Sequence, residues 1–425
     1  MSWSRDELSQ AAALEVLLHG PLTRAELAGN LGVAPATVTR ISADLIADGV
    51  LAESGAPVRG KAGRPGIPLD VVVDAQHFLG AKLTADSLSF VVTDLRAGVV
   101  REGVHPLPKR TPETVGAILA RIIAQGDEGI ASVGICLGAV VTSGGGVSTA
   151  PFLDWVDVPL ASVVEAVVGV PVFIENDVLA FTEAEHWFGE GAGCTSFATV
   201  TVGVATGYGC VANGRLLANQ DSGVGLVGHW PLEGFGPICS QGHRGCAESM
   251  LSTSMLSRQL SAALGRRVTW GEVVALAAAG QPAAEALIRE AAAGLGKLIA
   301  AIANLTAPER VVIGGEGVEL ARLGWDELAD GIAAHRDPRA SRVEVPQSWR
   351  SKDSSGEGKG SHPVRMRSCG QRAHAGGGVG RMTSCCLSDN WAFLRSRPNT
   401  IESFTLTRAS ENHHPLKAYV LLSNE

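Results

Sequence analysis

The sequence predicts an α/β fold in which a small, mostly helical N-terminal domain precedes a large domain of alternating strands and helices. Residues 21–53 have the pattern of a helix-turn-helix, and residues 78–345 alternate between apolar, strand-like runs and amphipathic, helix-like segments. Beyond residue 345 the composition changes abruptly. We therefore expect three regions, at 1–72, 78–345 and 346–425.

The first helix of the helix-turn-helix is predicted to begin after Thr23. Thr23 and Glu26 have the spacing of a capping box, in which the threonine hydroxyl accepts the N3 amide and the glutamate reaches back to the N-cap amide. Gly32 supplies the turn, because glycine adopts a left-handed conformation at the least cost. Pro35 fits the first turn of a second helix, where its missing N–H is not needed.

The second helix is the one expected to read DNA. Val38, Ile41 and Leu45 recur at helical spacing and are predicted to face inward. The side chains left outward near the helix start, where a recognition helix meets base edges in the major groove, are Ala36, Thr37, Thr39 and Arg40. An ordinary pair of short helices would share the apolar spacing, so the next stretch of sequence decides between the two interpretations.

That stretch has the pattern of a wing, a basic and glycine-rich loop between two strands. The strands are predicted at residues 49–51 and 67–73. The loop side chains expected to reach phosphates or a narrow minor groove are Arg59, Lys61 and Arg64. A solvated linker would have a similar composition and is the alternative for Arg64.

Composition limits the class of protein. A net charge of −8 and a pI of about 5.8 are not those of a protein that coats nucleic acid nonspecifically. Contact with DNA must come from local placement of basic side chains, and two copies are expected for affinity. The polar N-terminus and the absence of a long apolar run predict neither a signal peptide nor a membrane span. The irregularly spaced cysteines favour a reducing cytoplasm over a disulfide framework.

The large domain should bind its ligand at strand ends, as α/β sheets do. The segments predicted as strands are 88–95, 130–137, 170–174, 197–203 and 310–313. Those predicted as helices are 111–125, 158–168 and a helix-rich stretch over 247–304.

Four segments of this domain, residues 174–177 (IEND), 203–215, 223–229 and 239–248, resemble the ROK family of repressors, open reading frames and sugar kinases. Together with the helix-turn-helix, the resemblance spans about residues 10–345. It implies a two-lobed core of the ribonuclease-H-like, actin-like ATPase type around a sugar cleft. Family members with an added N-terminal domain are transcriptional regulators of sugar metabolism, usually repressors.

The same resemblance raises the question of kinase activity, which depends on loops that position phosphate and neutralise its charge. In ROK kinases the first loop has an Asp, two glycines and a Thr, whereas residues 82–86 read KLTAD here, with a lysine at the leading position. The second loop, Gly-Thr-Gly in the kinases, is Gly203-Val204-Ala205. We therefore expect no catalytic residue and no kinase activity, and a sugar kinase with a DNA-binding appendage is the alternative.

Sugar binding is the second function that the resemblance implies. The residues that match the family's sugar contacts are Asn176, Asp177, His229 and Glu248. Asp177 matches the catalytic base of the kinases, although a strand-end turn with Asx hydrogen bonds would also explain Asn176 and Asp177. Leu226 and Phe152 replace two expected polar contacts. This predicts altered or weakened recognition, and a different sugar, a less polar ligand and no ligand are the alternatives.

A zinc site is also implied, since ROK proteins usually bind one structural zinc through a histidine and three cysteines. His229, Cys239 and Cys246 occupy matching positions, but the middle cysteine is Gln241, and an amide oxygen is a poor zinc ligand. His243 lies close enough in the sequence to substitute. We predict zinc at His229, Cys239 and Cys246 with His243 as the candidate fourth ligand, and a metal-free loop is the alternative.

Residues 346–425 do not continue the pattern of the large domain. Ser, Arg, Gly, His and Cys replace Ala, Val and Leu, and basic residues outnumber acidic ones. The alanine-rich helix that closes the family's core is missing. An out-of-frame reading would produce this change, and a basic disordered extension is the alternative.

The sequence as a whole therefore predicts a cytoplasmic, sugar-responsive transcriptional regulator. It would bind a palindromic operator as a homodimer or homotetramer, without a membrane partner. A carbohydrate effector would shift lobe closure and thereby the spacing of two DNA-binding domains, through different affinities for the two states. A non-functional product of a frameshifted gene is a third hypothesis.

Overall fold

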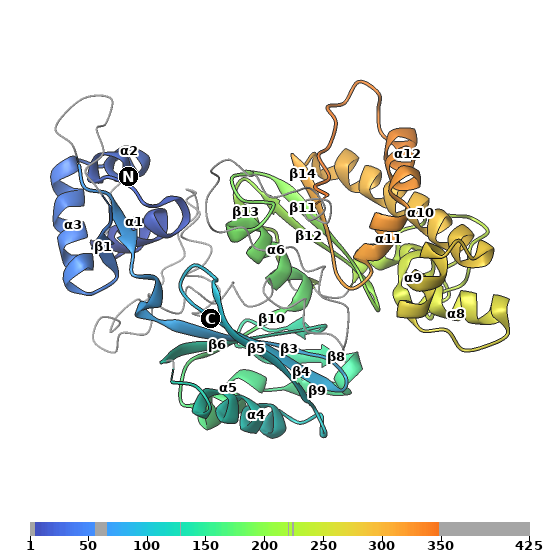
Figure 1. Ribbon diagram of the computed structural model, residues 1–425, viewed down its shortest axis with the longest axis horizontal. Coiled ribbons are helices and arrows are strands. Elements are labelled where there is room, and N and C mark those ends of the chain that lie inside the picture. The colour runs from blue at the N-terminus through green and yellow to red at the C-terminus, as the bar shows by residue number, and fades with distance from the viewer. Residues whose placement is uncertain (1–4, 56–65, 128, 220, 223–224, 348–425) are drawn as a thin grey trace.

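The computed structural model describes residues 5–55, 66–127, 129–219, 221–222 and 225–347, which form a small N-terminal domain and two α/β lobes (Figure 1). Residues 348–425 lie outside the described residues, so the two hypotheses for that segment stay predictions. None of the described helices is long and apolar enough to cross a membrane.

The N-terminal domain has the predicted helix-turn-helix. Its elements are α1 (Arg5–His19), α2 (Arg24–Leu31), α3 (Pro35–Ala47), β1 (Leu51–Glu53) and β2 (Leu69–Val71). The capping box is present, with Thr23 N donating to Glu26 Oε2 over 2.8 Å. Gly32 ends α2 in the left-handed region at φ 65°, and Pro35 opens α3. The three apolar residues predicted to face inward are buried in this domain's core.

The wing is described only at its base. β1 and β2 pair antiparallel, in the register Leu51↔Val71 and Glu53↔Leu69. Both strands are shifted or shortened relative to the predicted 49–51 and 67–73. Arg59, Lys61 and Arg64 lie outside the described residues, so their contacts with DNA stay predictions.

The first lobe is a five-stranded sheet in the order β10-β6-β3-β4-β5. Its strands are β3 (His77–Leu83), β4 (Ser87–Thr93), β5 (Val99–Pro106), β6 (Ile130–Leu137) and β10 (Val172–Asn176). β10, β6 and β3 run parallel. The helices α4 (Pro112–Ala124) and α5 (Leu160–Val168) cover one face, and α6 (Asp177–Phe188) lies on the other (Figure 1). Burial on both faces explains the continuous apolar run of β6.

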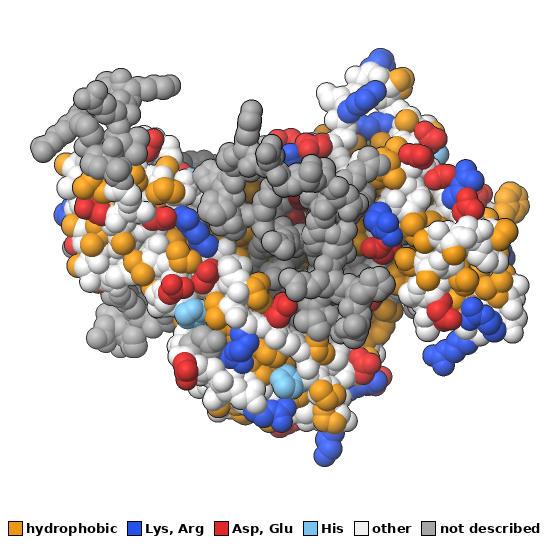
Figure 2. Space-filling model, in the orientation of Figure 1, with side chains coloured by type: hydrophobic (Ala, Val, Ile, Leu, Met, Phe, Trp, Pro, Cys, Tyr) orange, Lys and Arg blue, Asp and Glu red, His pale blue; other side chains and the backbone are white. Residues whose placement is uncertain are grey.

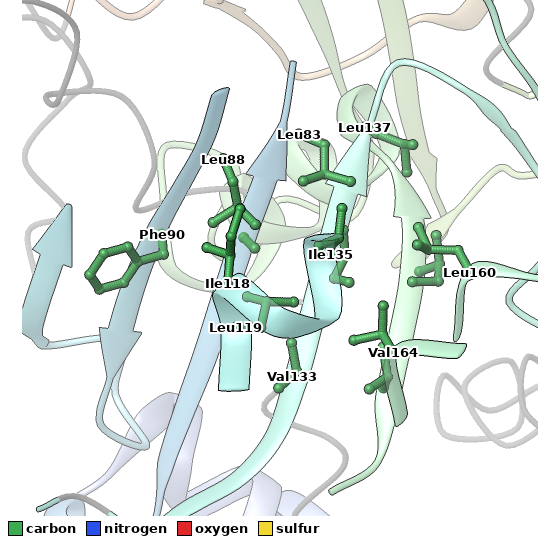
Figure 3. Close-up of a cluster of buried hydrophobic side chains, with 14 of the residues drawn as sticks. Leu83, Leu88, Phe90, Ile118, Leu119, Val133, Ile135, Leu137, Leu160 and Val164 are labelled. Carbon is green, nitrogen blue, oxygen red and sulfur yellow. The ribbon is translucent and has the colours of Figure 1, made fainter. Parts of the chain in front are cut away.

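The core of this lobe lies between the sheet and α4 and α5. Val133, Ile135 and Leu137 point from β6 toward Leu119 of α4 and Val164 of α5 (Figure 3). A smaller sheet flanks the lobe and is built from β7 (Val140–Val141), β8 (Val147–Ala150) and β9 (Trp155–Val158), with the 3₁₀ turn η2 (Pro151–Leu153) between β8 and β9.

The second lobe is a four-stranded sheet with helices packed against it. The sheet order is β13-β12-β11-β14, with β11 (Phe197–Val202), β12 (Thr206–Ala212), β13 (Arg215–Leu216) and β14 (Arg310–Gly314). The helical elements are η3 (Leu226–His229), α7 (Ala247–Leu251), α8 (Thr253–Leu264), α9 (Trp270–Ala278), α10 (Pro282–Thr306), α11 (Val318–Leu323) and α12 (Trp325–His335). The sheet and α10 share one apolar core, to which Val343 and Val345 add.

Most predicted elements of the large domain are present, and two boundaries differ for a local reason. β10 starts at Val172 because Gly169 ends α5 at φ 73° and Pro171 has no N–H to donate to a ladder. At its other end the strand continues two residues further than predicted, to Asn176, which pairs with Leu137 of β6. α5 starts at Leu160 rather than Val158, because Val158 pairs with Val147 in the small sheet.

Candidate functional site

The start of α3 presents side chains to solvent. Ala36, Thr39 and Arg40 are exposed, whereas Thr37 is half-buried. Thr39 Oγ1 donates to the Pro35 carbonyl at 2.9 Å, so its hydroxyl hydrogen is used within the helix. The N-cap residue, Ala34, supplies no side-chain cap to the first helical amides. Such amides and the helix dipole favour an anion at this end of the helix.

The second candidate site lies where β3, β6 and β10 end together. Leu137 of β6 is in register with Leu83 of β3 and with Asn176 of β10. Asn176 is the N-cap of α6, since its Oδ1 accepts the amides of Val178 at 2.9 Å and Leu179 at 3.3 Å. Its Nδ2 donates to a main-chain carbonyl, Ala139 O, at 3.0 Å. The Asx turn considered as an alternative is therefore present at Asn176.

Asp177, the residue that matches the kinase base, faces a cation. Its Oδ2 lies 3.6 Å from Lys82 Nζ, and both side chains are partly exposed. Lys82 stands at the leading position of the first loop. A base that accepts a hydroxyl proton must be within hydrogen-bond reach of that proton, and here an ammonium group is its neighbour.

The second loop contains a carboxylate from elsewhere in the lobe. Glu316 Oε1 accepts the Val204 amide at 3.2 Å, and Gly203 N donates to the Ala205 carbonyl at 3.0 Å. A methyl group added at Gly203 would lie 3.2 Å from the same Glu316 oxygen. The loop amide that a phosphate oxygen would need is thus bound to a negative group of the protein itself.

His229 and Glu248 approach Asp177 from the second lobe. A methyl group at Gly207 of β12 would lie 2.5 Å from Val178, the residue after Asp177. A methyl group at Gly228, beside His229, would lie 3.4 Å from the carbonyl of Thr206, which precedes Gly207, and 3.8 Å from Glu248 Oε2. These close contacts link the start of α6, which contains Asp177, through β12 to the segments that contain His229 and Glu248.

Two apolar side chains flank these polar groups. Phe152 is 48% exposed and its ring lies beside Gly138, one residue before the carbonyl that holds Asn176. Leu226 is 67% exposed and opens the turn that ends at His229. Large apolar side chains with this much exposure are available to a ligand that has an apolar face.

The structure brings together three of the four residues predicted to bind zinc. Cys239 Sγ lies 3.8 Å from His229 Nδ1 and 3.7 Å from His243 Nδ1. A tetrahedral zinc would separate sulfur and nitrogen by about 3.5 Å, given Zn–S near 2.3 Å and Zn–N near 2.0 Å. These three residues form the only such group found among the described residues. Cys246 is outside the group, and its Sγ contacts Ser249 Oγ at 3.7 Å.

Two carboxyl groups of β10 and α6 are perturbed by their surroundings. Burial raises the pKa of Glu175 to about 7, against the opposing effect of its hydrogen bond from the Asn176 amide. Burial likewise raises the pKa of Glu185 to about 7, although its carboxylate accepts the Glu190 amide at 2.8 Å.

Residues 79–341 match the family model described as the ROK family, which covers more than half of the chain. The chain belongs to the ROK family. A curated relative, the DNA-binding transcriptional repressor Mlc of Escherichia coli strain K12, is 27% identical over 344 residues, covering 76% of this chain and 84% of Mlc. A ROK family transcriptional regulator described as a homolog of the E. coli MLC protein has a similar structure, with a TM-score of 0.68 at 23% identity over 80% of this chain and 92% of that one.

ROK enzymes share the fold of the two lobes. The crystal structure of ROK hexokinase from Thermus thermophilus gives a TM-score of 0.53 at 26% identity and covers 64% of this chain and 92% of the hexokinase. The ROK regulator covers more of this chain than the hexokinase does. The two-lobed α/β class predicted from the sequence is confirmed.

Sequence reasoning missed two residues of this region. Glu316 follows Gly314-Gly315, and no local pattern connects it to Val204, 112 residues earlier. Lys82 is visible in the sequence as a change of residue type, but its pairing with Asp177 depends on the parallel alignment of β3, β6 and β10.

Proposed function

We propose that this ROK protein is a DNA-binding transcriptional regulator whose core binds a carbohydrate effector without phosphorylating it. The exposed start of α3, with Ala36, Thr37, Thr39 and Arg40, would read base edges of an operator. Arg59, Lys61 and Arg64 of the wing would contact phosphates or the minor groove. Binding to a palindromic operator requires two copies, and the cytoplasm is where such DNA is found.

The proposal that the core does not phosphorylate its ligand rests on the position of Glu316. Phosphoryl transfer depends on amides and cations that neutralise phosphate charge, and here a carboxylate holds the Val204 amide. Lys82 meanwhile pairs with Asp177, the carboxylate that matches the base of the ROK kinases. A phosphate entering the second loop would have to displace Glu316 and would meet its negative charge.

Incubation of the full chain with ATP, magnesium and a panel of hexoses tests this part directly. We expect phosphate transfer no faster than in a sample without protein. Appreciable phosphorylation of any sugar would refute the non-enzymatic core and support the alternative, a kinase with a DNA-binding domain. Selection of bound fragments from genomic DNA tests the other half, and enrichment of a palindromic sequence is the expected result.

We further propose that His229, Cys239 and His243 hold a zinc ion and that Cys246 is not one of its ligands. One thiolate and two imidazoles suit zinc, and their mutual distances are close to those of a tetrahedral site. The ion would link the turn at His229 to the loop over residues 239–243, next to Gly228 and Glu248. It would therefore stabilise the second-lobe side of the effector site.

Metal content by mass spectrometry separates this ligand set from the one predicted from the sequence. His243→Ala and Cys239→Ser should each lose most of the bound zinc, whereas Cys246→Ser should retain it. Loss of zinc from Cys246→Ser would restore the sequence-based set, with or without His243 according to whether His243→Ala also loses zinc. Zinc at background level in the unmodified protein would favour the metal-free loop.

A further inference from the structure

The turn between β4 and β5, residues 94–98, contacts both the DNA-binding domain and α6, and the proposed function gives it no role. It belongs to the first lobe, yet its side chains contact α1 and β2 on one side and α6 on the other. Figure 1 shows the N-terminal domain joined to this lobe by a short connection that passes beside the same turn.

Arg96 makes the contact with the DNA-binding domain. Its Nη2 donates to Asp70 Oδ1 at 2.6 Å and to the Val16 carbonyl at 3.2 Å. Both side chains of the ion pair are mostly buried, with 15% of Arg96 and 21% of Asp70 exposed. Gly20 leaves room for the Arg96 guanidinium, since a methyl group at Gly20 would lie 3.2 Å from Arg96 Nη2. A charge-assisted bond in such a setting is stronger than an exposed surface pair.

The turn that carries Arg96 is held by its own hydrogen bonds. Asp94 Oδ1 accepts the amides of Arg96 at 2.8 Å and Gly98 at 2.7 Å. The Leu95 amide donates to the Val73 carbonyl, in the connection between the two domains, at 3.2 Å. Movement of the turn would therefore move Arg96 and the connection together.

On its other side the turn packs against α6. Ala97 is buried, and it forms an apolar cluster with Ala184 and Phe188 from the last part of the helix. The opposite end of α6 starts at Asp177, in the candidate effector site, about 17 Å away at the rise of an α-helix. One helix thus touches the effector site with its first residue and the Arg96 turn with its last two turns.

We propose that Arg96 is a positioning residue that couples α6 to the orientation of the DNA-binding domain. The role of this coupling in regulation rests on the proposed function, whereas the contacts of Arg96 themselves do not depend on what the effector is. A ligand that favours one position of α6 would act on Ala97, and Arg96 would transmit the change to Asp70 and Val16. Close-packed contacts of this kind switch between discrete arrangements rather than stretching.

Hydrogen–deuterium exchange of the full chain tests the coupling without DNA or effector, so its outcome is independent of the proposed function. Arg96→Ala and Asp70→Asn should each raise exchange about tenfold or more in segments 12–20 and 69–75, as expected for loss of a hydrogen bond to a charged group. The double variant should add little to Arg96→Ala, because that variant already removes the ion pair with Asp70. Unchanged exchange in both segments would overturn the proposal.

The matched control is Arg101→Ala. Arg101 also donates from Nη2 to a main-chain carbonyl, Ile122 O at 3.0 Å, but it does so within the first lobe. It should leave exchange in segments 12–20 and 69–75 unchanged. Arg96→Lys keeps the charge and tests the geometry if Arg96→Ala does not fold, and it should give an intermediate increase.

Phe188→Ala tests the α6 side of the coupling. If α6 is linked to the DNA-binding domain through Ala97, this variant should raise exchange in segment 69–75 as well as in α6. An increase confined to α6 would leave Arg96 as a static contact between domains and would overturn its coupling role. The coupling role would also be overturned if a variant of Arg96 changed exchange only in its own turn, residues 94–98.

Discussion

The first turns of α3 and α6 are similar in backbone and opposite in how their polar groups are used. α3 starts after Ala34, which gives its first amides no side-chain cap, and its outer residues are exposed. α6 starts after Asn176, which accepts two amides and donates to Ala139, while Asp177 faces Lys82. The start of α3 thus leaves its first amides without a side-chain cap and its outer residues exposed to solvent. The start of α6 is held by internal bonds, with which any ligand must compete.

Acidic and basic side chains are mixed over the described surface of both lobes on the face that Figure 2 draws. Three predictions test the comparison, and a fourth extends it to two carboxylates outside these helix starts; they follow from the largest expected effect to the smallest.

Asn176→Ala should cause the largest loss of stability. The variant removes a cap that serves two amides and leaves the buried Ala139 carbonyl without its Asn176 donor. We expect the free energy of unfolding to fall by about 3 kcal/mol. Urea unfolding followed by circular dichroism measures it, with Asn219→Ala, in an exposed turn, as the control. A loss no larger than the control's would mean that the internal bonds at α6 contribute little.

Arg40→Ala should affect operator binding rather than stability. An arginine that reads a base contributes about 1–3 kcal/mol of discrimination, so the variant should bind operator and unrelated DNA with more similar affinity. Fluorescence anisotropy on both DNAs at several salt concentrations measures this. Lys61→Ala is the comparison, because a phosphate contact should weaken binding on all sequences. Equal loss on every sequence for Arg40→Ala would contradict its role as a base reader.

The pH dependence of stability should have opposite signs at Glu185 and Glu26. Burial raises the folded-state pKa of Glu185 to about 7, so its contribution is present below about pH 4.5 and is lost as the pH rises through 7. The Thr23 amide and hydroxyl lower the pKa of Glu26, so its contribution is present above pH 4.5 and is lost on acidification.

Glu185→Gln should therefore be more stable than the parent at pH 8, on the order of 2 kcal/mol, with the difference vanishing near pH 4. Glu26→Gln should be less stable than the parent at pH 7, and that difference should also disappear in acid. Thermal unfolding between pH 4 and pH 8 measures both. The same sign for the two variants would show that their environments are not opposite.

Ala34→Ser should give the smallest effect. Ala34 has extended backbone angles, φ −65° and ψ 140°, which suit an N-cap, and a serine hydroxyl there would accept one of the first amides of α3. We expect a gain of about 1 kcal/mol in the stability of the DNA-binding domain. Urea unfolding measures it, with Ala43→Ser on the exposed face of the same helix as the control. A gain equal to the control's would show that the first amides of α3 already have other hydrogen-bond partners.

The parts of the molecule that could be predicted are those whose signals are local. Thr23, Glu26, Gly32 and Pro35 lie within thirteen residues and fix the ends of two helices, and the structure has all four in the expected roles. The apolar run of β6 is likewise local, and its bounds at 130–137 agree.

The contacts at the second loop and at the domain boundary join segments that are distant in the sequence, and no sequence pattern predicts them. Glu316 and Val204 are 112 residues apart, and Arg96 and Asp70 are 26 apart across a domain boundary. Cys246 is a further example: the family resemblance implies that it is a ligand, and in the structure its sulfur lies 3.7 Å from Ser249 Oγ at the start of α7. Such contacts depend on the alignment of strands and on loop geometry, which single-residue patterns do not specify.

The connection between the DNA-binding domain and the core also limits which operators can be bound. Only residues 72–76 separate β2 from β3, and three of them form the 3₁₀ turn η1 (Val73–Ala75). So short a connection cannot let a recognition helix travel around the double helix. In an assembly of two copies, half-sites must lie on the same side of the DNA, separated by whole turns of about 10.5 base pairs. Inserting five base pairs between them should abolish simultaneous binding, and inserting ten should not restore it, because the half-sites would then lie about 34 Å further apart.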